Sequence, residues 1–325
     1  MEFYGNKVYI LIEGQPNSPE IPFLKTVIRQ LINRSQIFHV DFDLIAVGGS
    51  QAFNAMARLI YEKSNVHKRI PVLAITDRDF KREQDIQRKQ QTTDHNLVNN
   101  NVVRELCWPR HEWENYLLEE TDMLAEIFNQ LPIRQSGQPS SPSKKPKLFK
   151  RRNTILSKTQ LDNWLKEYFQ HKIKDELIEC LKFRFNTDKI CPQLENVSND
   201  DILDIAAIKN WFLRPIEQNC QAEIRSQHIE EINSRFEDTL AELDWETWLN
   251  NPSLVDFDQA KRYFRGKEAF ENLFEKLNQE VDLVPGKTYR NFIKEIMLPE
   301  MEHQPDCLLI QELGTMLLPY FEIVA

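Results

Sequence analysis

The first part of the chain alternates between short runs of apolar residues and longer stretches with helical periodicity. The apolar runs, each of which predicts a buried strand, are residues 7–12 (KVYILI), 43–47 (DLIAV), 69–76 (RIPVLAIT) and, more weakly, 101–106 (NVVREL). Residues 21–32 place their apolar side chains on one helical face, and Ser50 is a good N-cap for a helix that continues to Tyr61. Continuous apolar strands separated by helices predict a parallel sheet covered on both faces. We therefore expect a Rossmann-like α/β domain over residues 1–130.

The polar pattern changes twice in the rest of the chain. Residues 131–156 are rich in Ser and Pro and then strongly basic, a composition that cannot bury a core and predicts a linker or an insertion. The basic run 144–152 has two readings, an arm that contacts nucleic acid or a solvated run of charge. Residues 157–325 keep a helical spacing of apolar positions almost to the end, which predicts an α-helical second domain.

Composition narrows the class of protein. The 325 residues carry 41 Lys and Arg against 50 Asp and Glu, a net charge of −9, so nucleic acid would have to be bound through a local cationic patch or through metal ions. The longest apolar runs are about six residues, far below the ~20 that span a bilayer, and MEFYGNK lacks the features of a secretory signal. Five cysteines without a CxxC pair indicate reduced thiols. We expect a cytoplasmic protein with no membrane association.

Acidic side chains follow three of the predicted strands. Glu13 comes directly after the first strand, Asp77 and Asp79 come after the third, and Glu114 lies just beyond the fourth. Ligands bind outside the carboxyl ends of parallel strands, and alternate residues of an extended chain point the same way, so Asp77 and Asp79 could share one ion. Any one of these acids could equally form a turn or cap a helix. Acids at the ends of three strands, in order, predict a site for Mg²⁺ or Mn²⁺.

These motifs resemble those of a known family. The order strand-Glu-Gly, strand-Gly-Gly and strand-Asp-x-Asp resembles the Toprim domain shared by topoisomerases, primases and the overcoming-lysogenization-defect (OLD) nucleases. The stretch HEWENYLLEE looks like the Glu-Asn-Tyr-Leu signature of the OLD-like branch, and YFRGKEAFENL looks like its Gly-Lys segment. The arrangement also resembles that of AriB, the effector subunit of PARIS anti-phage systems. The resemblance covers residues 7–120 and, beyond them, only residues 265–273.

The resemblance implies a Toprim-type sheet that carries a metal-dependent nuclease site. It matches Glu13 to the family's first metal-binding glutamate, Asp77 and Asp79 to its Asp-x-Asp ligands, and Glu114 to the glutamate of the Glu-Asn signature. These side chains would hold one or two Mg²⁺ or Mn²⁺ ions, which activate water for phosphodiester cleavage.

Two further residues are assigned by the same resemblance. Lys267 matches the family's lysine, which would neutralise charge on the phosphoryl oxygens. Glu20 matches the family's second acid, a further metal ligand, only if QPNSP is a loop insertion, because Glu20 lies seven positions after Glu13.

Cations and aromatic residues near these acids bear on substrate binding. Arg78, Lys81 and Arg82, together with the 144–152 run, are the cations expected to contact nucleic acid. Trp108 and Trp113 flank the acidic motif, where they would either stack on a base or belong to the core.

The resemblance also bears on partners. It implies a stand-alone endonuclease or the effector subunit of a separate ATPase partner protein, with tRNA or DNA as substrate and with toxicity held in check until phage infection. The helical half offers surface for a homo-oligomer. Two alternatives stay open: a non-catalytic Toprim-like module that binds nucleic acid or serves as a scaffold, and a phosphotransfer enzyme or phosphatase with Asp77 as its nucleophile.

Overall fold

The computed structural model describes residues 7–16, 18, 20–37, 39–63, 71–97, 103–133, 149–151, 153–187, 204–219, 222–281, 288–304 and 307–324. The chain divides into two compact units. The first, here called the α/β unit, combines Met1–Asp162 with Gly266–Ala325, and the second, the helical unit, is Asn163–Arg265. None of the described helices is long and apolar enough to cross a lipid bilayer.

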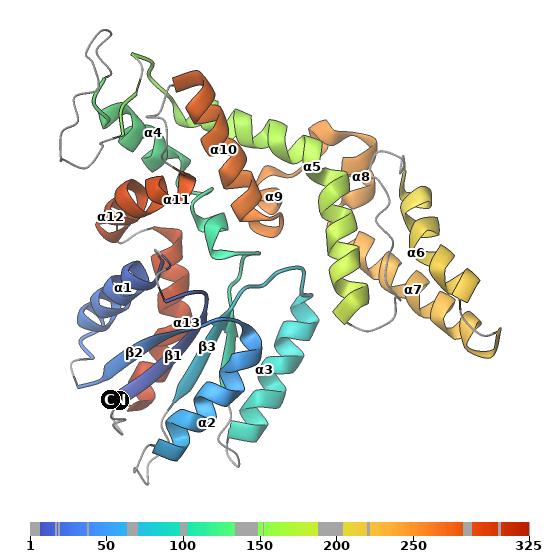
Figure 1. The fold of residues 1–325 in the computed structure, drawn as a ribbon, viewed down its shortest axis with the longest axis horizontal. Coiled ribbons are helices and arrows are strands. Elements are labelled where there is room, and N and C mark those ends of the chain that lie inside the picture. Colours follow the sequence, from blue (N-terminus) through green and yellow to red (C-terminus); the bar gives the residue numbers. More distant parts are fainter. Residues whose placement is uncertain are drawn as a thin grey trace. The chain divides into compact units, whose positions relative to one another are not determined.

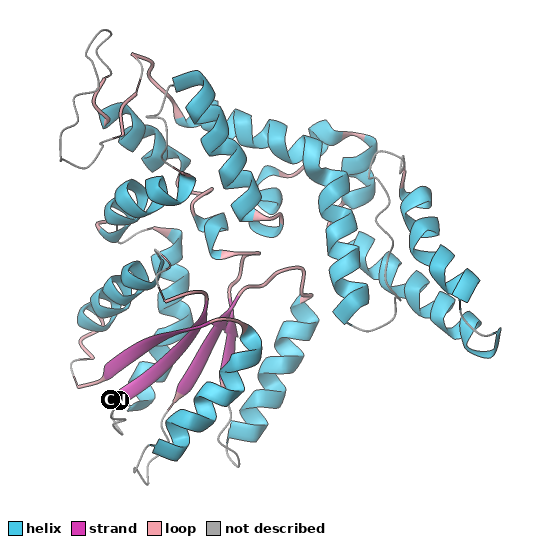
Figure 2. Cartoon of the chain, viewed as in Figure 1, coloured by secondary structure: helices cyan, strands magenta, loops and turns pink. Residues whose placement is uncertain are grey.

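A four-stranded parallel sheet forms the centre of the α/β unit (Figures 1 and 2). Its strands are β1 (Lys7–Glu13), β2 (Asp41–Val47), β3 (Val72–Thr76) and β4 (Arg104–Cys107), in the spatial order β2-β1-β3-β4. The two central strands are almost wholly buried, which is why they read as continuous apolar runs. The structure therefore confirms the predicted parallel α/β sheet.

Helices cover both faces of the sheet. α2 (Phe53–Lys63) packs Phe53 and Ile60 against Tyr9 and Leu11 of β1, and α3 (Glu83–Leu97) lies beside β4. α1 (Glu20–Arg34) and α13 (Leu308–Val324) pack together on the other side of the sheet, as Figure 1 shows. Strand order and right-handed crossovers explain this division, because the chain turns one way after β1 and the other way after β2.

The last part of the chain belongs to the α/β unit. α10 (Gly266–Val281), α11 (Tyr289–Phe292), the π-helical turn Ile293–Met297 and α12 (Leu298–Glu302) precede α13 there. Phe321 of α13 meets the ring of Phe42 edge-on at 6.2 Å, and Tyr320 lies 5.9 Å from the guanidinium of Arg104. The predicted helical domain, 157–325, therefore differs from the helical unit of the structure. Helical spacing shows that a segment has an apolar face but does not show what that face packs against.

The helical unit has its own aromatic core. It contains the greater part of α5 (Lys158–Thr187), followed by α6 (Ile205–Asn219), α7 (Ala222–Glu242), α8 (Trp245–Asn250) and α9 (Phe257–Tyr263). Phe264 stacks on Trp245 with ring centroids 5.5 Å apart and meets Phe169 edge-on at 5.6 Å. These contacts confirm the apolar helical pattern of this part of the chain.

The predicted linker 131–156 is only partly a linker. Phe149 is buried and meets Phe292 at 5.3 Å, and Arg151 donates hydrogen bonds to the main-chain oxygens of Leu131 and Thr154. Residues 134–148 and 152, which include most of the basic run 144–152, lie outside the described residues. Arg151, near the end of this run, is therefore bonded to the main chain of the α/β unit, and the choice between the two readings of the run falls on residues outside the described ones. α4 (Thr121–Gln130) precedes this segment.

Candidate functional site

The order of the strands creates a crevice at one edge of the sheet. From β1 the chain passes to β2 on one side, and it then returns to β3 on the other side of β1. The carboxyl ends of β1 and β3 therefore flank a topological switch point, where ligands bind in open parallel sheets. Ile12 is paired with Ile75, so Glu13 and Asp77 follow at nearly the same height.

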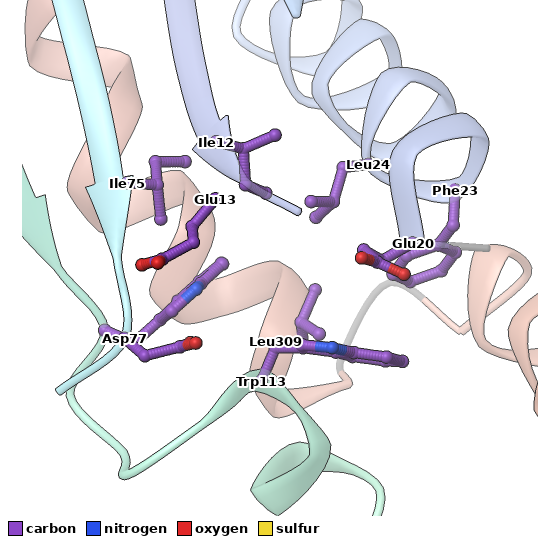
Figure 3. Close-up of a pocket in the computed structure, with 10 residues that line it drawn as sticks. Ile12, Glu13, Glu20, Phe23, Leu24, Ile75, Asp77, Trp113 and Leu309 are labelled. Carbon is purple, nitrogen blue, oxygen red and sulfur yellow. The ribbon is translucent and has the colours of Figure 1, made fainter. Parts of the chain in front are cut away.

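A cavity of about 20 Å³ opens at this switch point, and a site needs roughly 10–15 Å³ to hold one water molecule. Glu13, Asp77 and Glu20 bring carboxylates to it from β1, from the end of β3 and from the start of α1 (Figure 3). The rest of its wall is apolar or aromatic and consists of Ile12, Phe23, Leu24, Ile75, Trp108, Trp113 and Leu309. The structure therefore brings Glu20 to the same cavity as Glu13 and Asp77.

Glu13 is held in place by the turn after β2. Its Oε1 accepts a hydrogen bond of 3.3 Å from the main-chain N–H of Ser50, and a Cβ on Gly49 would lie 3.8 Å from that oxygen. The prediction that Ser50 caps a helix is wrong, because Ser50 begins a 3-10 turn (Ser50–Ala52) that precedes α2. The Gly-Gly-Ser turn instead presents a main-chain donor to the first acid.

The pKa of Asp77 is strongly perturbed. Burial, reinforced by the nearby charges of Asp79, Glu112 and Glu13, raises the pKa of Asp77 to about 8, although Lys81 acts in the opposite direction. Lys81 donates from Nζ to the main-chain oxygen of Asp77 at 2.5 Å and to Oδ2 of Asp79 at 3.0 Å. The carboxyl of Asp77 thus lies near other carboxyls, and Lys81 supplies positive charge beside it.

The backbone of Asp79 is not extended, as an alternating Asp-x-Asp pair would require. Its φ is +49°, in the left-handed region, and its main-chain N–H donates to the oxygen of His111 at 2.9 Å. The prediction that Asp77 and Asp79 alternate along an extended chain is therefore wrong. Asp79 instead forms an ion pair with Lys81 and joins the end of β3 to the segment that follows β4.

Two of the expected nucleic-acid contacts are already engaged in the fold. Arg78 is buried and pairs with Glu83 at 3.0 Å, and Arg82 pairs with Asp85 at 2.8 Å. Lys81, the third of these neighbouring cations, pairs with Asp79 at 3.0 Å and so lies beside the acids themselves.

The segment after β4 adds two acids. Burial raises the pKa of Glu114 well above its ordinary value, and the nearby charges of Glu112, Asp77 and Glu20 contribute to the same shift. Burial and Asp79 also raise the pKa of Glu112, which the sequence analysis did not include. Glu114 is therefore close enough to interact electrostatically with Asp77 and with Glu20, which line the cavity from different elements. The only sequence signal for Glu112 was its place two residues before Glu114.

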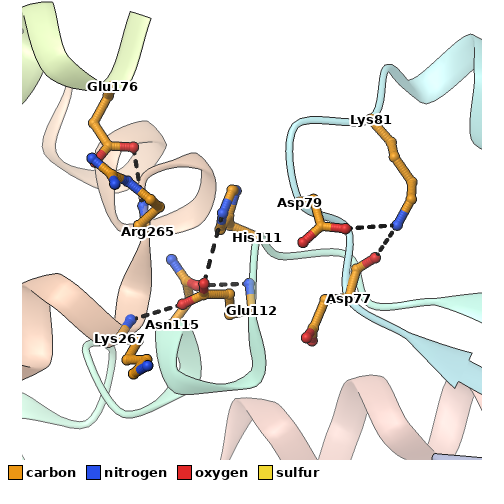
Figure 4. Close-up of polar contacts among 9 residues, drawn as sticks. All are labelled: Asp77, Asp79, Lys81, His111, Glu112, Asn115, Glu176, Arg265 and Lys267. Carbon is orange, nitrogen blue, oxygen red and sulfur yellow. Dashed lines mark hydrogen bonds and ion pairs between the residues drawn. The ribbon is translucent and has the colours of Figure 1, made fainter. Parts of the chain in front are cut away.

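Lys267 reaches this segment through its main chain. Its N–H donates to Oε2 of Glu112 at 2.9 Å, although the two residues are 155 positions apart, and its charge lowers the pKa of Glu112 (Figure 4). Gly266 lies so close to Asn115 that a Cβ there would clash with the side-chain amide. The structure therefore brings together residues 112–115 with Gly266 and Lys267, which belong to the two segments that carry the family resemblance outside the sheet.

Arg290 is a second residue that the sequence analysis missed. Its side chain is exposed, and its positive charge lowers the pKa of Glu20, which burial otherwise raises. Its Nε donates to the Tyr289 hydroxyl at 3.1 Å. No local pattern marks Arg290, because it lies far along the chain from the acids.

The donor set suits a hard divalent cation. Carboxylate oxygens are the ligands that Mg²⁺ and Mn²⁺ prefer, and the pKa of Asp77 is raised first by burial and then by the charges of nearby carboxyls. Among the described residues, no three His, Cys, Asp or Glu side chains stand in an arrangement that could hold a metal as they are. Metal binding would therefore require carboxylate side chains to turn inward.

Comparisons of the chain with protein-family models, with curated proteins and with solved structures found no match.

Proposed function

We propose that the α/β unit is a Toprim-type nuclease that uses Mg²⁺ or Mn²⁺ to hydrolyse phosphodiester bonds of nucleic acid. The observation that carries this proposal is the gathering of Glu13, Glu20, Asp77 and Glu114 around the switch point of a parallel sheet. Three of these acids line one cavity, and the fourth senses the charge of two of them. Such a site repels the phosphates of nucleic acid unless cations intervene.

The residues of the chain have separate roles in this proposal. A bound divalent ion would supply an activated water and neutralise charge on the phosphate. Glu13, Asp77 and Glu114, with Glu20 opposite, would hold it through their oxygens. Lys81 orients the end of β3 by binding the main chain of Asp77, and Lys267 would place positive charge beside the phosphoryl oxygens.

We further propose that tRNA or DNA is the substrate and that the protein is a toxic effector in anti-phage defence, controlled by a separate ATPase. This part rests on the resemblance of the motifs around residues 13, 77, 114 and 267 to the OLD-like branch.

Cleavage of a substrate panel tests the proposal. Plasmid DNA, single-stranded DNA and total tRNA are incubated with the purified chain and Mg²⁺, Mn²⁺ or EDTA. We expect metal-dependent cleavage that falls at least about 1,000-fold in Glu13→Gln and Asp77→Asn. Glu62→Gln, an exposed glutamate on α2, is the matched control and should cleave like the wild type. Metal-dependent cleavage retained in Asp77→Asn would refute the assignment.

A non-catalytic binding or scaffold module is the second candidate, favoured by the lack of a ready three-ligand group among the described residues. It predicts that neutralising Glu13 and Asp77 leaves nucleic-acid binding intact without any cleavage. A phosphatase that uses Asp77 as nucleophile would instead form a covalent aspartyl phosphate and act on small phosphoesters.

A further inference from the structure

We propose that Trp113 is a base-stacking residue of the acidic site and that its indole ring receives an unpaired nucleotide of the substrate. Trp113, the acids of the cavity and the segments that hold them all belong to the α/β unit. The inference rests on the proposed function, because it names the form of nucleic acid, a single strand or an unpaired loop, that this site would accept.

The two tryptophans that line the cavity have different surroundings. Trp108 is buried, and its ring meets the ring of Tyr116 edge-on at 5.5 Å, so it belongs to the core. Trp113 is partly exposed. Over the part of the chain that the structure describes, its indole makes no ring contact and no hydrogen bond. Of the two rings, that of Trp113 is therefore the one available to a ligand.

The backbone of Trp113 is held at both ends of a short turn. Trp113 begins the 3-10 turn of residues 113–116, and the N–H of the preceding residue donates to Oδ1 of the fully buried Asn115 at 2.8 Å. At the end of the turn, Tyr116 is fully buried, and its hydroxyl donates to Glu312 of α13. The indole is thus presented from a fixed backbone, which lowers the entropic cost of binding a base against it.

The ring lies where a stacked nucleotide would reach the acids. Trp113 lines the cavity together with Asp77 and Glu20, alongside which Figure 3 shows it, and Glu114 is the next residue of the chain. The cavity of about 20 Å³ has room for water or an ion but not for a base. A base would therefore lie on the exposed part of the ring, while its phosphate faces the carboxylates and any ion that they hold.

Stacking supplies affinity that charge alone does not supply at this site. The acids repel the phosphates of a nucleic acid, and Lys81, which lies beside Asp77, is already paired with Asp79. Stacking on an aromatic ring does not depend on a charged partner and accepts every base. A duplex keeps the faces of its bases within the helical stack, and taking a base out of it costs free energy. The site should therefore prefer unpaired nucleotides.

Fluorescence anisotropy with short labelled oligonucleotides tests the inference. The probes are single strands of DNA and of RNA with the same sequence, the duplex of each, and a strand of the same length that lacks its bases. With Mg²⁺ present, and read immediately after mixing, we expect the preferred single strand to bind the wild type at least about 10-fold more tightly than its duplex or the abasic strand. The tighter of the two single strands identifies the sugar of the substrate.

Two variants of Trp113 separate stacking from a structural role. Trp113→Leu keeps an apolar side chain in the cavity wall but has no aromatic face, so it should bind the single strand about 10-fold more weakly and the abasic strand as the wild type does. Trp113→Phe should recover part of the loss. Neither variant should change the slope of log affinity against log salt concentration, because no phosphate contact is removed.

Trp211→Leu is the matched control, because Trp211 is a partly exposed tryptophan of α6 in the helical unit, and this variant should bind every probe as the wild type does. The inference is overturned if Trp113→Leu binds the single strand like the wild type, or if it weakens binding of the abasic strand equally. It is also overturned if the wild type binds the duplex as tightly as the single strand or binds no probe. An equal loss in Trp211→Leu would overturn it as well.

Cleavage of the same probes distinguishes this inference from the proposed function. Gels of the mixtures show whether the strands are cut in Mg²⁺ or Mn²⁺. Strands that stay intact would count against the nuclease, whereas the affinities would still decide the stacking role. Strands that are cut, with unchanged affinity in Trp113→Leu, would overturn the stacking role alone.

Discussion

Replacing Asp77 with asparagine is expected to stabilise the α/β unit when no divalent ion is present. In an unfolded chain this carboxyl has its ordinary pKa of 3.8, whereas burial first, and neighbouring acids second, raise the pKa of Asp77 in the fold to about 8. The folded state therefore binds the proton more tightly than the unfolded state, and this group makes the fold less stable as pH rises from 3.8 to about 8. Asparagine is of similar size and stays neutral throughout.

The size of the effect follows from the two pKa values. Each pKa unit corresponds to about 1.4 kcal/mol, so the carboxyl costs the fold roughly 2 kcal/mol at about pH 5 and roughly 5 kcal/mol at about pH 8. Asp77→Asn should raise the free energy of unfolding by these amounts, more at the higher pH. Asp77 would then be required for the proposed reaction although it lowers the stability of the fold, which is a common trade-off at functional sites.

Native-state amide exchange of β1 and β3 measures this free energy for the α/β unit alone. Asp85→Asn is the control, because Asp85 forms an ordinary ion pair with Arg82 and its replacement should change stability by less than about 1 kcal/mol at either pH. Mg²⁺ or Mn²⁺ should stabilise the wild type at about pH 8 and not Asp77→Asn. A gain that is absent, or equal at both pH values, would refute the electrostatic argument.

Two further predictions concern packing. Gly266→Ala should cost about 1–3 kcal/mol of unfolding free energy, because its Cβ would meet the fully buried Asn115. Gly48→Ala is the control and should be nearly neutral, because no atom lies within 4 Å of its Cβ. Equal thermal stabilities of the two variants would contradict the close approach of Gly266 to Asn115. Asn129→Ala should lower the free energy of unfolding by about 1–3 kcal/mol and speed proteolysis near residue 156, since Asn129 forms hydrogen bonds of 2.7 and 2.9 Å with the main chain of Leu156. An unchanged rate of proteolysis would show that these two hydrogen bonds are dispensable.

The sheet and part of the site could be predicted from the sequence because their signals are local. Burial on both faces makes β1 and β3 continuous apolar runs, and a parallel sheet then places Glu13 and Asp77 at the same edge. The cavity confirms that these two acids meet, and it adds Glu20, whose spacing from Glu13 departs from the family pattern.

Other parts of the site depend on contacts between distant segments, which local patterns do not reveal. Glu112 lies before a 3-10 turn without periodicity, and its partner, the N–H of Lys267, could not be identified from either segment alone. The left-handed backbone of Asp79 overrides the alternation expected of an extended strand end. The packing partner of α13 could likewise not be predicted, because an apolar helical face can pack in a helical bundle or against a sheet.

The interrupted α/β unit has a consequence for synthesis on the ribosome. All four strands are complete once residue 107 has emerged, but α13, which packs on β1 and α1, begins only at Leu308. At about 5–20 residues per second, the ribosome needs roughly 10–40 seconds to translate the intervening stretch of about 200 residues. During that time one face of the sheet lacks its last helix, and Leu309 and Lys267 are missing from the acidic site. A nascent chain would therefore acquire a finished site only after Leu309 has emerged, well after the four strands themselves are complete.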